Sequence, residues 1–246
     1  MYNQSKRKLH LKGLLTAVVL ASGLSLATTA VNATAVLTGS VNGVPSGNHY
    51  ENFDSVPLGD GTYTTPSGIK VSFIPDAKAV QGAASGLYAP PVLSNNNGTL
   101  FGNPENGTDA TTYLTSGSTG TFSNAGVSLL FPTPERYMGL LWGSVDKFNT
   151  LTFYSGAELV AQFTGNDVTT AASGDQGANG TFYVNISSTL AFDRVVATSS
   201  SHAFEFDNVA FNANPLKVPE PGIAGVFLLG LLLVGSGYWF KGRRLT

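Results

Sequence analysis

The feature that most constrains the fold is a series of short strand-like segments separated by turn residues. Between residues 68 and 212, runs that are apolar or alternate apolar with polar residues recur, and Gly, Asn, Ser or Pro stand between them. These runs are residues 68–74, 126–132, 137–144, 149–156, 158–165, 180–187, 192–200 and 203–212. Strands at this spacing predict an all-β fold, a single antiparallel β-sandwich of the jelly-roll kind.

Two of the connections between these segments are informative. Ser155-Gly156-Ala157 separates two strand-like runs by a few residues, which predicts a short hairpin loop. Residues 76–120 contain the polar run NNNGTLFGNPENGTD and are predicted to form a long surface excursion with more loop than strand. The chain has no cysteine, so disulfides, zinc–thiolate sites and cysteine nucleophiles are excluded.

The N-terminal segment has the pattern of a secretory signal peptide. A basic stretch, SKRKLHLK, precedes the apolar run GLLTAVVLASGLSLA, and small residues follow it at the spacing of a cleavage site. We expect residues 1–33 to be removed by signal peptidase after Ala33. The alternative is an uncleaved N-terminal anchor.

The C-terminal segment has the pattern of a membrane span. Residues 223–240 carry no charge, and as a helix they would extend about 27 Å, enough to cross the hydrocarbon core. Lys241, Arg243 and Arg244 lie in the basic tail, residues 241–246, and are expected to stay on the cytoplasmic side. The alternative, a buried core helix, fits so long an apolar run less well.

A Pro-Glu-Pro triplet stands immediately before this span, in Val218-Pro219-Glu220-Pro221-Gly222. Its two prolines favour an extended, accessible backbone. The triplet, the apolar helix and the terminal arginines together resemble the PEP-CTERM sorting signal of Gram-negative, exopolysaccharide-producing bacteria. The resemblance covers residues 218–246. It implies that a membrane-embedded exosortase processes the tail at or near Val218, Pro219, Glu220 and Pro221.

These assignments leave residues 34–217 as one predicted ectodomain, and its charge limits its partners. Six Lys and Arg stand against fourteen Asp and Glu, a net charge of −8. A surface of this sign is not suited to nucleic acid. The expected location is a membrane-anchored precursor that passes to the cell surface or beyond it.

The sequence GLLWGSVDKFNTLTFYSG suggests a candidate cation site. Asp146 and Asn149 stand in the turn between two predicted strands, and Asp207 lies on the final strand with Glu205 on the same face. Their oxygens would suit Ca²⁺, the one cofactor that the sequence suggests. The alternative is that Asp146 and Asn149 cap the turn through backbone amides.

Residues 126–212 also resemble the ectodomains of one PEP-CTERM surface-protein group, which pairs a WGSxDxxN turn with a terminal D-N-V strand. The resemblance implies a sandwich of the carbohydrate-binding-module kind without a known catalytic activity.

No motif for catalysis is evident. His49 and His202, the two histidines after the predicted signal peptide, have no metal-ligand spacing, and no nucleophile elbow or Walker loop is present. We therefore expect a non-catalytic surface or matrix protein that contacts extracellular polysaccharide, with Tyr63, Tyr88 and Tyr113 as candidate stacking residues. A secreted glycoside hydrolase and a purely structural coat protein remain alternatives.

Overall fold

The computed structural model describes residues 35–40, 45, 48–119 and 124–216, with residues 35–40 described as backbone only. The predicted signal peptide with Ala33, the triplet region Val218–Pro221, the predicted span 223–240 and the basic residues Lys241, Arg243 and Arg244 lie outside these residues. Among the residues that are described, no helix is long and apolar enough to cross a membrane.

The described chain is mostly antiparallel β-sheet, with 52% of residues in strands and 6% in helices, so the predicted all-β class is confirmed. The main sheet has 11 strands, and its longest path runs β11-β10-β12-β9-β13-β8-β5. The strands on this path are β5 (Ala77–Val80), β8 (Tyr113–Ser116), β9 (Ala125–Gly143), β10 (Asn149–Ser155), β11 (Glu158–Thr164), β12 (Phe182–Ser199) and β13 (Phe204–Asn212).

Shorter elements complete the fold. β1 (Ala35–Ser40) pairs with β12, β2 (His49–Glu51) with β13, and β4 (Lys70–Phe73) with both β3 (Thr62–Thr64) and β9. β6 (Val92–Leu93) and β7 (Gly107–Thr108) form a separate two-stranded sheet. The helical turns are η1 (Thr99–Phe101), α1 (Gly165–Val168) and η2 (Ala178–Gly180).

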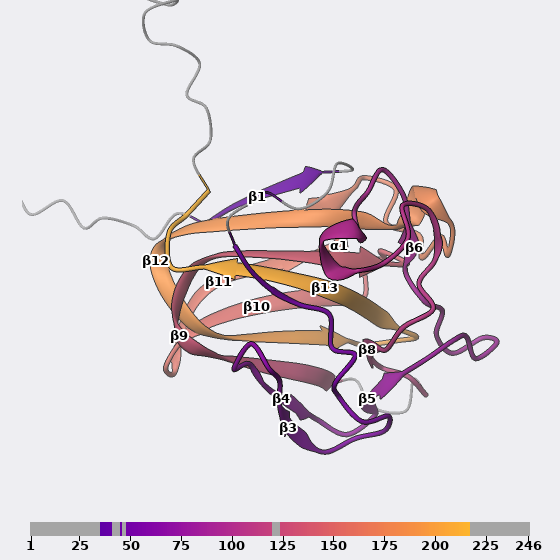
Figure 1. Cartoon of the computed structure of the whole chain (residues 1–246), viewed down its shortest axis with the longest axis horizontal. Helices are drawn as coiled ribbons and strands as arrows, with labels where there is room; N and C mark the ends of the chain where they lie inside the picture. Colours follow the sequence, from indigo (N-terminus) through magenta and orange to yellow (C-terminus); the bar gives the residue numbers. More distant parts are fainter. Residues whose placement is uncertain (1–34, 41–44, 46–47, 120–123, 217–246) are drawn as a thin grey trace, which may run out of the picture. The chain divides into compact units, whose positions relative to one another are not determined.

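β9 and β12 are the two long strands around which the sheet is built (Figure 1). Each joins two segments that the sequence predicts as separate strands. Residues 125–130 of β9 pair with residues 194–199 of β12, and residues 137–142 pair with residues 182–187. The pairing shifts register between these halves, where Pro132 and Pro134 of β9 have no backbone N–H to donate.

The two halves of this long pair belong to two arms of the sheet. In the first arm the neighbours are β3, β4, β9, β12, β10 and β11, and in the second they are β1, β12, β9, β13, β8 and β5. Side chains of both arms meet in one apolar core. Its members include Val127, Leu129, Met138, Leu140, Trp142, Val184, Ile186, Val195, Phe204 and Phe206.

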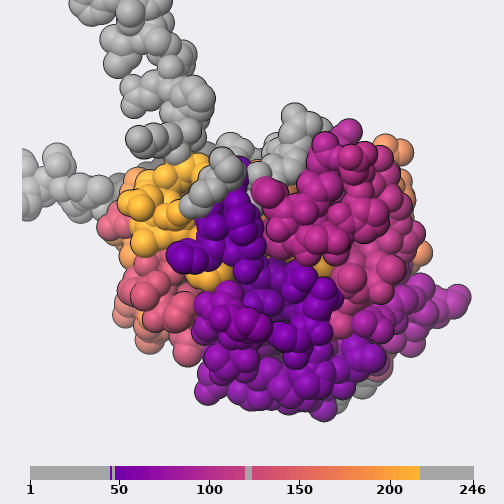
Figure 2. All heavy atoms as spheres, in the orientation of Figure 1, coloured from indigo at the N-terminus to yellow at the C-terminus, as the bar shows by residue number. Residues whose placement is uncertain are grey.

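The second arm is buried on its other face as well. There Tyr137 and Leu141 of β9 alternate with the core residues and pack with Tyr183, Leu93 and Phe101 in a second apolar cluster. Leu93 lies in β6 and Phe101 in η1. Both belong to residues 76–119, which we call the covering segment. In Figure 2 residues 48–119, in indigo to magenta, cover much of the visible face.

This covering segment corrects one expectation from the sequence. Residues 76–120 hold more loop than strand, as predicted, but they are not a surface excursion, because they also contain β5, β6, η1, β7 and β8. All four residues of β8 are buried, because β8 pairs with β13 on one side and with β5 on the other. The segment is therefore part of the fold rather than an excursion from it.

Candidate functional site

The predicted turn between β9 and β10 is organised by Asn149. Its Oδ1 accepts hydrogen bonds from the indole N–H of Trp142 at 3.2 Å and from the backbone N–H of Asp146 at 3.3 Å. Its Nδ2 donates to Ser199 Oγ at 3.2 Å and to the carbonyl of Ala203 at 3.0 Å. With its side chain fully buried, Asn149 joins β9, β10, β12 and the start of β13.

Asp146 is also held by the turn. Its Oδ1 accepts the backbone N–H of Phe148 at 2.6 Å, and 7% of the residue is exposed. Burial raises the pKa of this carboxyl, while the N–H groups of Phe148 and Asn149 and the charge of Lys147 lower it. A Cβ atom at Gly165 would collide with the carbonyl oxygen of Asp146, so the glycine lets α1 pack directly on the turn. These contacts are the capping role predicted as the alternative to calcium binding.

Asp207, the third predicted calcium ligand, has different neighbours. It is completely buried, and burial, the charge of Asp109 and a hydrogen bond to the Asp109 side chain raise its pKa well above the ordinary value. If both carboxyls were ionised, neither oxygen of Asp207 nor Oδ2 of Asp109 would have a donor. A proton between the two side chains would supply one. Asp207 therefore forms a buried carboxyl pair with Asp109.

Glu205 is the acidic residue of β13 that lies near Asp146. It is 1% exposed, and its Oε1 accepts the backbone N–H of Ala89 at 3.0 Å, while its buried Oε2 has no partner in the described structure. Burial raises the pKa of Glu205 to about 8; the N–H of Ala89 acts against this shift, and the charge of Asp146 adds to it. Asp146 and Glu205 line one small cavity, of which Asn149 and Asp207 are not part.

The same small cavity contains no complete set of charged metal ligands. Within the described part of the chain, no three His, Cys, Asp or Glu side chains gather closely enough to hold a metal ion. The predicted trio Asp146, Asn149 and Asp207 is thus divided between a turn and a buried carboxyl pair.

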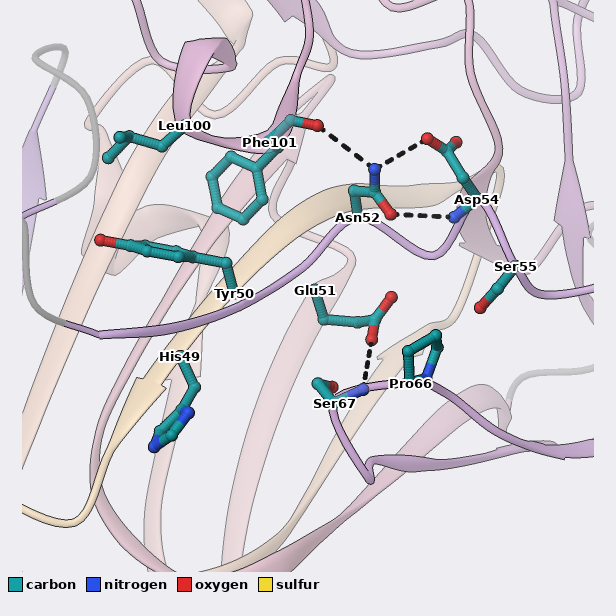
Figure 3. Close-up of a pocket in the computed structure, with 10 residues that line it drawn as sticks. All are labelled: His49, Tyr50, Glu51, Asn52, Asp54, Ser55, Pro66, Ser67, Leu100 and Phe101. Carbon is teal, nitrogen blue, oxygen red and sulfur yellow. Dashed lines mark hydrogen bonds between the residues drawn. The ribbon is translucent and has the colours of Figure 1, made fainter.

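A larger groove lies elsewhere, where the segment from β2 to Ser55 meets η1 and the turn at Pro66 and Ser67 (Figure 3). Its volume is about 580 Å³. Tyr50 and Phe101 stand edge to face on one side, with ring centroids 5.5 Å apart and an interplanar angle of 82°. Leu100 beside them is 49% exposed, so the groove presents apolar surface to solvent.

Polar side chains on the other side of the groove are fixed by hydrogen bonds. Asn52 Nδ2 donates to Asp54 Oδ2 at 2.8 Å and to the carbonyl of Phe101 at 3.2 Å, which ties η1 to the loop after β2. The two oxygens of Glu51 accept the backbone N–H groups of Phe53 at 2.9 Å and Ser67 at 3.4 Å. Figure 3 shows these side chains around the groove.

The charged side chains of the groove are acidic. Glu51 and Asp54 line it, and no described Lys or Arg does. Burial, together with the charges of Asp109 and Glu51, raises the pKa of Asp54, while hydrogen bonds from Thr112 and Thr111 lower it. His49 also lines the groove and stacks on Phe211, with centroids 5.3 Å apart. The groove therefore combines exposed apolar surface with carboxylate acceptors.

The aromatic residues that the sequence suggested for stacking on sugars lie outside this groove. Tyr113 is fully buried and its hydroxyl donates to the carbonyl of Gly82, so the suggestion is wrong for this residue. Tyr63 and Tyr88 are half-buried, and neither lines the groove. The two histidines line different cavities, His49 the groove and His202 the small cavity.

Sequence reasoning missed the groove because its lining comes from three separate segments, residues 49–55, 66–67 and 100–101. The polar and aromatic residues of the YENFDS run were the available signal. No protein-family model, curated protein or solved structure matches this chain.

Proposed function

We propose that this chain is an exported, exosortase-processed protein of the cell surface or extracellular matrix that binds polysaccharide without cleaving it. Its domain would be a single β-sandwich of the jelly-roll kind, and its ligand would lie in the groove between Tyr50, Asp54 and Phe101. The alternatives are a carbohydrate-active hydrolase and a structural coat protein without a ligand.

Export and sorting rest on the two ends of the sequence. The basic and apolar pattern before Ala33 supports signal peptidase cleavage, and the Pro219-Glu220-Pro221 triplet with the apolar run and Arg243 and Arg244 supports exosortase processing. The first described strand, β1, starts at Ala35 and pairs with β12.

The sandwich assignment rests on the two arms of the sheet. β9 and β12 contribute to both arms, and inward side chains of both form one core. Strands that pass from one layer to the other through bulges are a known way to close a β-sandwich.

The observation that carries polysaccharide binding is the groove. Sugars offer an apolar ring face and hydroxyl groups, and the groove offers the half-buried ring of Tyr50 and the exposed side chain of Leu100 opposite the carboxylate of Asp54. Phe101 is buried and supports the ring of Tyr50 from the side. Because Glu51 and Asp54 are acidic and no described Lys or Arg lines the groove, it favours neutral or amino-sugar polymers over uronate or sulfated ones.

Both oxygens of Glu51 accept backbone hydrogen bonds, an arrangement that supports a structural role for this carboxylate. This contact favours binding over hydrolysis, because an acid–base pair must be free to exchange protons with the substrate.

Titration of the full-length chain with oligosaccharides tests the proposal. The oligosaccharides are fragments of neutral β-glucan, chitosan and alginate. The readouts are the amount of bound oligosaccharide and the release of reducing ends. We expect binding of one of the first two and no hydrolysis. Leu100→Ala and Tyr50→Ala should weaken that binding at least about tenfold. Leu159→Ala is the matched control, since Leu159 is an exposed leucine on β11.

Binding that survives both groove variants would place the ligand elsewhere. If none of the three oligosaccharides binds, the coat protein is favoured. Release of reducing ends would favour the hydrolase.

A further inference from the structure

The first arm of the sheet has one face in the core and one face outside it. Val71, Leu129 and Phe153 belong to the core, so the residues that alternate with them along the strands lie on the opposite face. Cross-strand pairing arranges part of this opposite face in a row across β3, β4, β9, β12, β10 and β11. We call it the outer row; its members are Thr64, Lys70, Leu130, Arg194, Tyr154 and Leu159.

The outer row is positively charged, although the predicted ectodomain is acidic. Lys70 and Arg194 stand on either side of Leu130, and no member of the row is Asp or Glu. The neighbouring row on the same face, which runs from Thr62 to Gln162, has no charged residue. Within the described residues neither Lys70 nor Arg194 forms an ion pair. Both positive charges are therefore available to an anion.

Two acidic residues lie near one end of the outer row, at the hairpin of β10 and β11. Both carboxylate oxygens of Asp193 accept the backbone N–H of Gly156, at 3.0 and 3.1 Å. Glu158 is the first residue of β11 and is exposed. Lys70, on β4, is separated from this hairpin by β9 and β12. The acidic residues are thus at the edge of the row and not between its two cations.

Arg194 is held in position before any ligand binds. Its Cζ lies 4.1 Å from the ring centroid of Tyr154, the residue opposite it on β10, in a cation–π contact. Its Nη2 donates a long hydrogen bond, 3.5 Å, to the carbonyl of Gly156. The other N–H groups of the guanidinium have no partner among the residues described. Their planar arrangement suits a carboxylate, and a side chain fixed in advance loses less entropy on binding.

Exposed leucines stand beside the charged residues of the row. Leu130, 42% exposed, lies between Lys70 and Arg194, and Leu159, 63% exposed, lies next to Tyr154. Strands in a sheet are about 4.8 Å apart, so the backbones of Lys70 and Arg194, two strands apart, are about 10 Å from each other. A ligand that reaches both cations is therefore extended, with anionic groups at intervals and apolar surface between them.

We propose that the outer row binds an acidic polysaccharide of the uronate class. Its carboxylates would pair with Arg194 and Lys70, and its ring faces would lie on Leu130 and Leu159. Duplex nucleic acid suits the row less well, because it carries one phosphate per about 1.7 Å of its axis and the row offers only two cations.

This site is separate from the groove, since no member of the outer row lines the groove. A protein with both sites would cross-link a neutral polymer to an acidic one. That consequence rests on the proposed function of the groove, whereas binding at the outer row does not.

Binding of polygalacturonate to the full-length chain in mild detergent tests the site, and the methyl ester of the same polymer is the uncharged comparison. We expect the acid form alone to bind, several-fold more weakly when NaCl is raised from about 50 to about 300 mM. Arg194→Gln and Lys70→Gln should each weaken binding at least about threefold. Lys147→Gln makes the same charge change at an exposed residue of the β9–β10 turn and should have much less effect.

A second pair of variants adds a charge instead of removing one. Leu130→Glu places a carboxylate between the two cations and should abolish binding. Leu190→Glu is the matched control, because Leu190 on β12 is 43% exposed and lies outside the outer row. Since both leucines are exposed, both variants should fold, which thermal unfolding checks.

Three results would overturn the proposal. These are equal binding of polygalacturonate and its methyl ester, equally tight binding of duplex DNA, and binding that survives Leu130→Glu or the two cation substitutions, which would assign it to the basic ends of the sequence. Tyr50→Ala should leave polygalacturonate binding unchanged, because Tyr50 belongs to the groove. Loss of binding in that variant would move the acidic polymer to the groove. Neutral β-glucan reports on the groove alone, so the two proposals can fail separately.

Discussion

The indole N–H of Trp142 donates to Oδ1 of Asn149, with the two atoms 3.2 Å apart. This bond closes the turn from the end of β9 to the start of β10. The same indole stacks on Phe204 of β13, with ring centroids 4.3 Å apart and planes inclined by 18°. The pair therefore connects a polar turn to the apolar core, and the spacing of Trp142 and Asn149 in the sequence follows from the length of that turn.

Asn149→Ala should destabilise the domain by about 2–4 kcal/mol, because it removes two acceptor and two donor contacts at a fully buried position. Urea unfolding at pH 7 measures the change. Asn106→Ala, at an exposed site, serves as the control. A loss no greater than that of the control would mean that the hydrogen bonds of Asn149 contribute little to stability.

Glu205→Gln should stabilise the domain, and the gain should grow as pH rises from 4.5 to about 8. The folded state keeps the proton of Glu205 up to about pH 8, whereas the unfolded state loses it near 4.5. Wild-type stability consequently falls as pH rises from 4.5 to about 8, by up to about 1.4 kcal/mol per pH unit from this group, and is level above.

The variant has no such proton, so the difference between the two proteins should follow this window. Urea unfolding at pH 5, 6.5, 8 and 9 measures it, and Glu158→Gln should show no comparable trend. A difference that does not change with pH would argue against a buried, protonated Glu205.

Asp207→Asn should also stabilise the folded state at pH 7, by about 1–3 kcal/mol. At this pH the unfolded chain carries an ionised Asp207, and burial beside Asp109 disfavours that charge in the folded state, which raises its pKa. The amide needs no proton, and its N–H can donate to Oδ2 of Asp109, which otherwise has no donor.

The coupling between these two carboxyls can be measured with a double-mutant cycle that adds Asp109→Asn. We expect a non-additive free energy of unfolding, since the first substitution already removes the need to share a proton. Additive effects, or a destabilised Asp207→Asn, would show that the pair is not coupled as described.

The strand pattern allowed the class of the fold to be predicted, because alternation and apolar runs reflect burial directly. The limits of β9 and β12 were not predictable. Pro132 and Pro134 indicate a break in the sequence, yet β9 continues past them, since its partner β12 shifts register at the same level. β8 was missed because YLTS is short, and its burial comes from β5 and β13, which are distant in sequence.

The candidate sites could also be predicted only where the partner residues lie close together in the sequence. The turn role of Asn149 was predictable as an alternative because its partners Trp142 and Asp146 are local. The meeting of Asp207 with Asp109, and of Tyr50 with Phe101, depends on how the covering segment folds over the second arm. No local pattern contains this information.

Processing at the tail gives the last prediction. Replacing Pro219, Glu220 and Pro221 by alanine should leave the chain in the membrane fraction at its precursor mass, because the extended segment that an exosortase would recognise is lost and the helix is free to continue upstream. Mass spectrometry of the C-terminus, in the native organism, reads the outcome.

Pro215→Ala is the control for this experiment, since it removes a proline from the same connection but leaves the triplet intact. The wild type and this control should both yield a shortened C-terminus. If the triple variant is shortened in the same way as the wild type, the triplet is not the processing signal. If the wild type keeps residues 223–246, the tail acts as a permanent anchor, and the domain stays at the membrane rather than passing into the matrix.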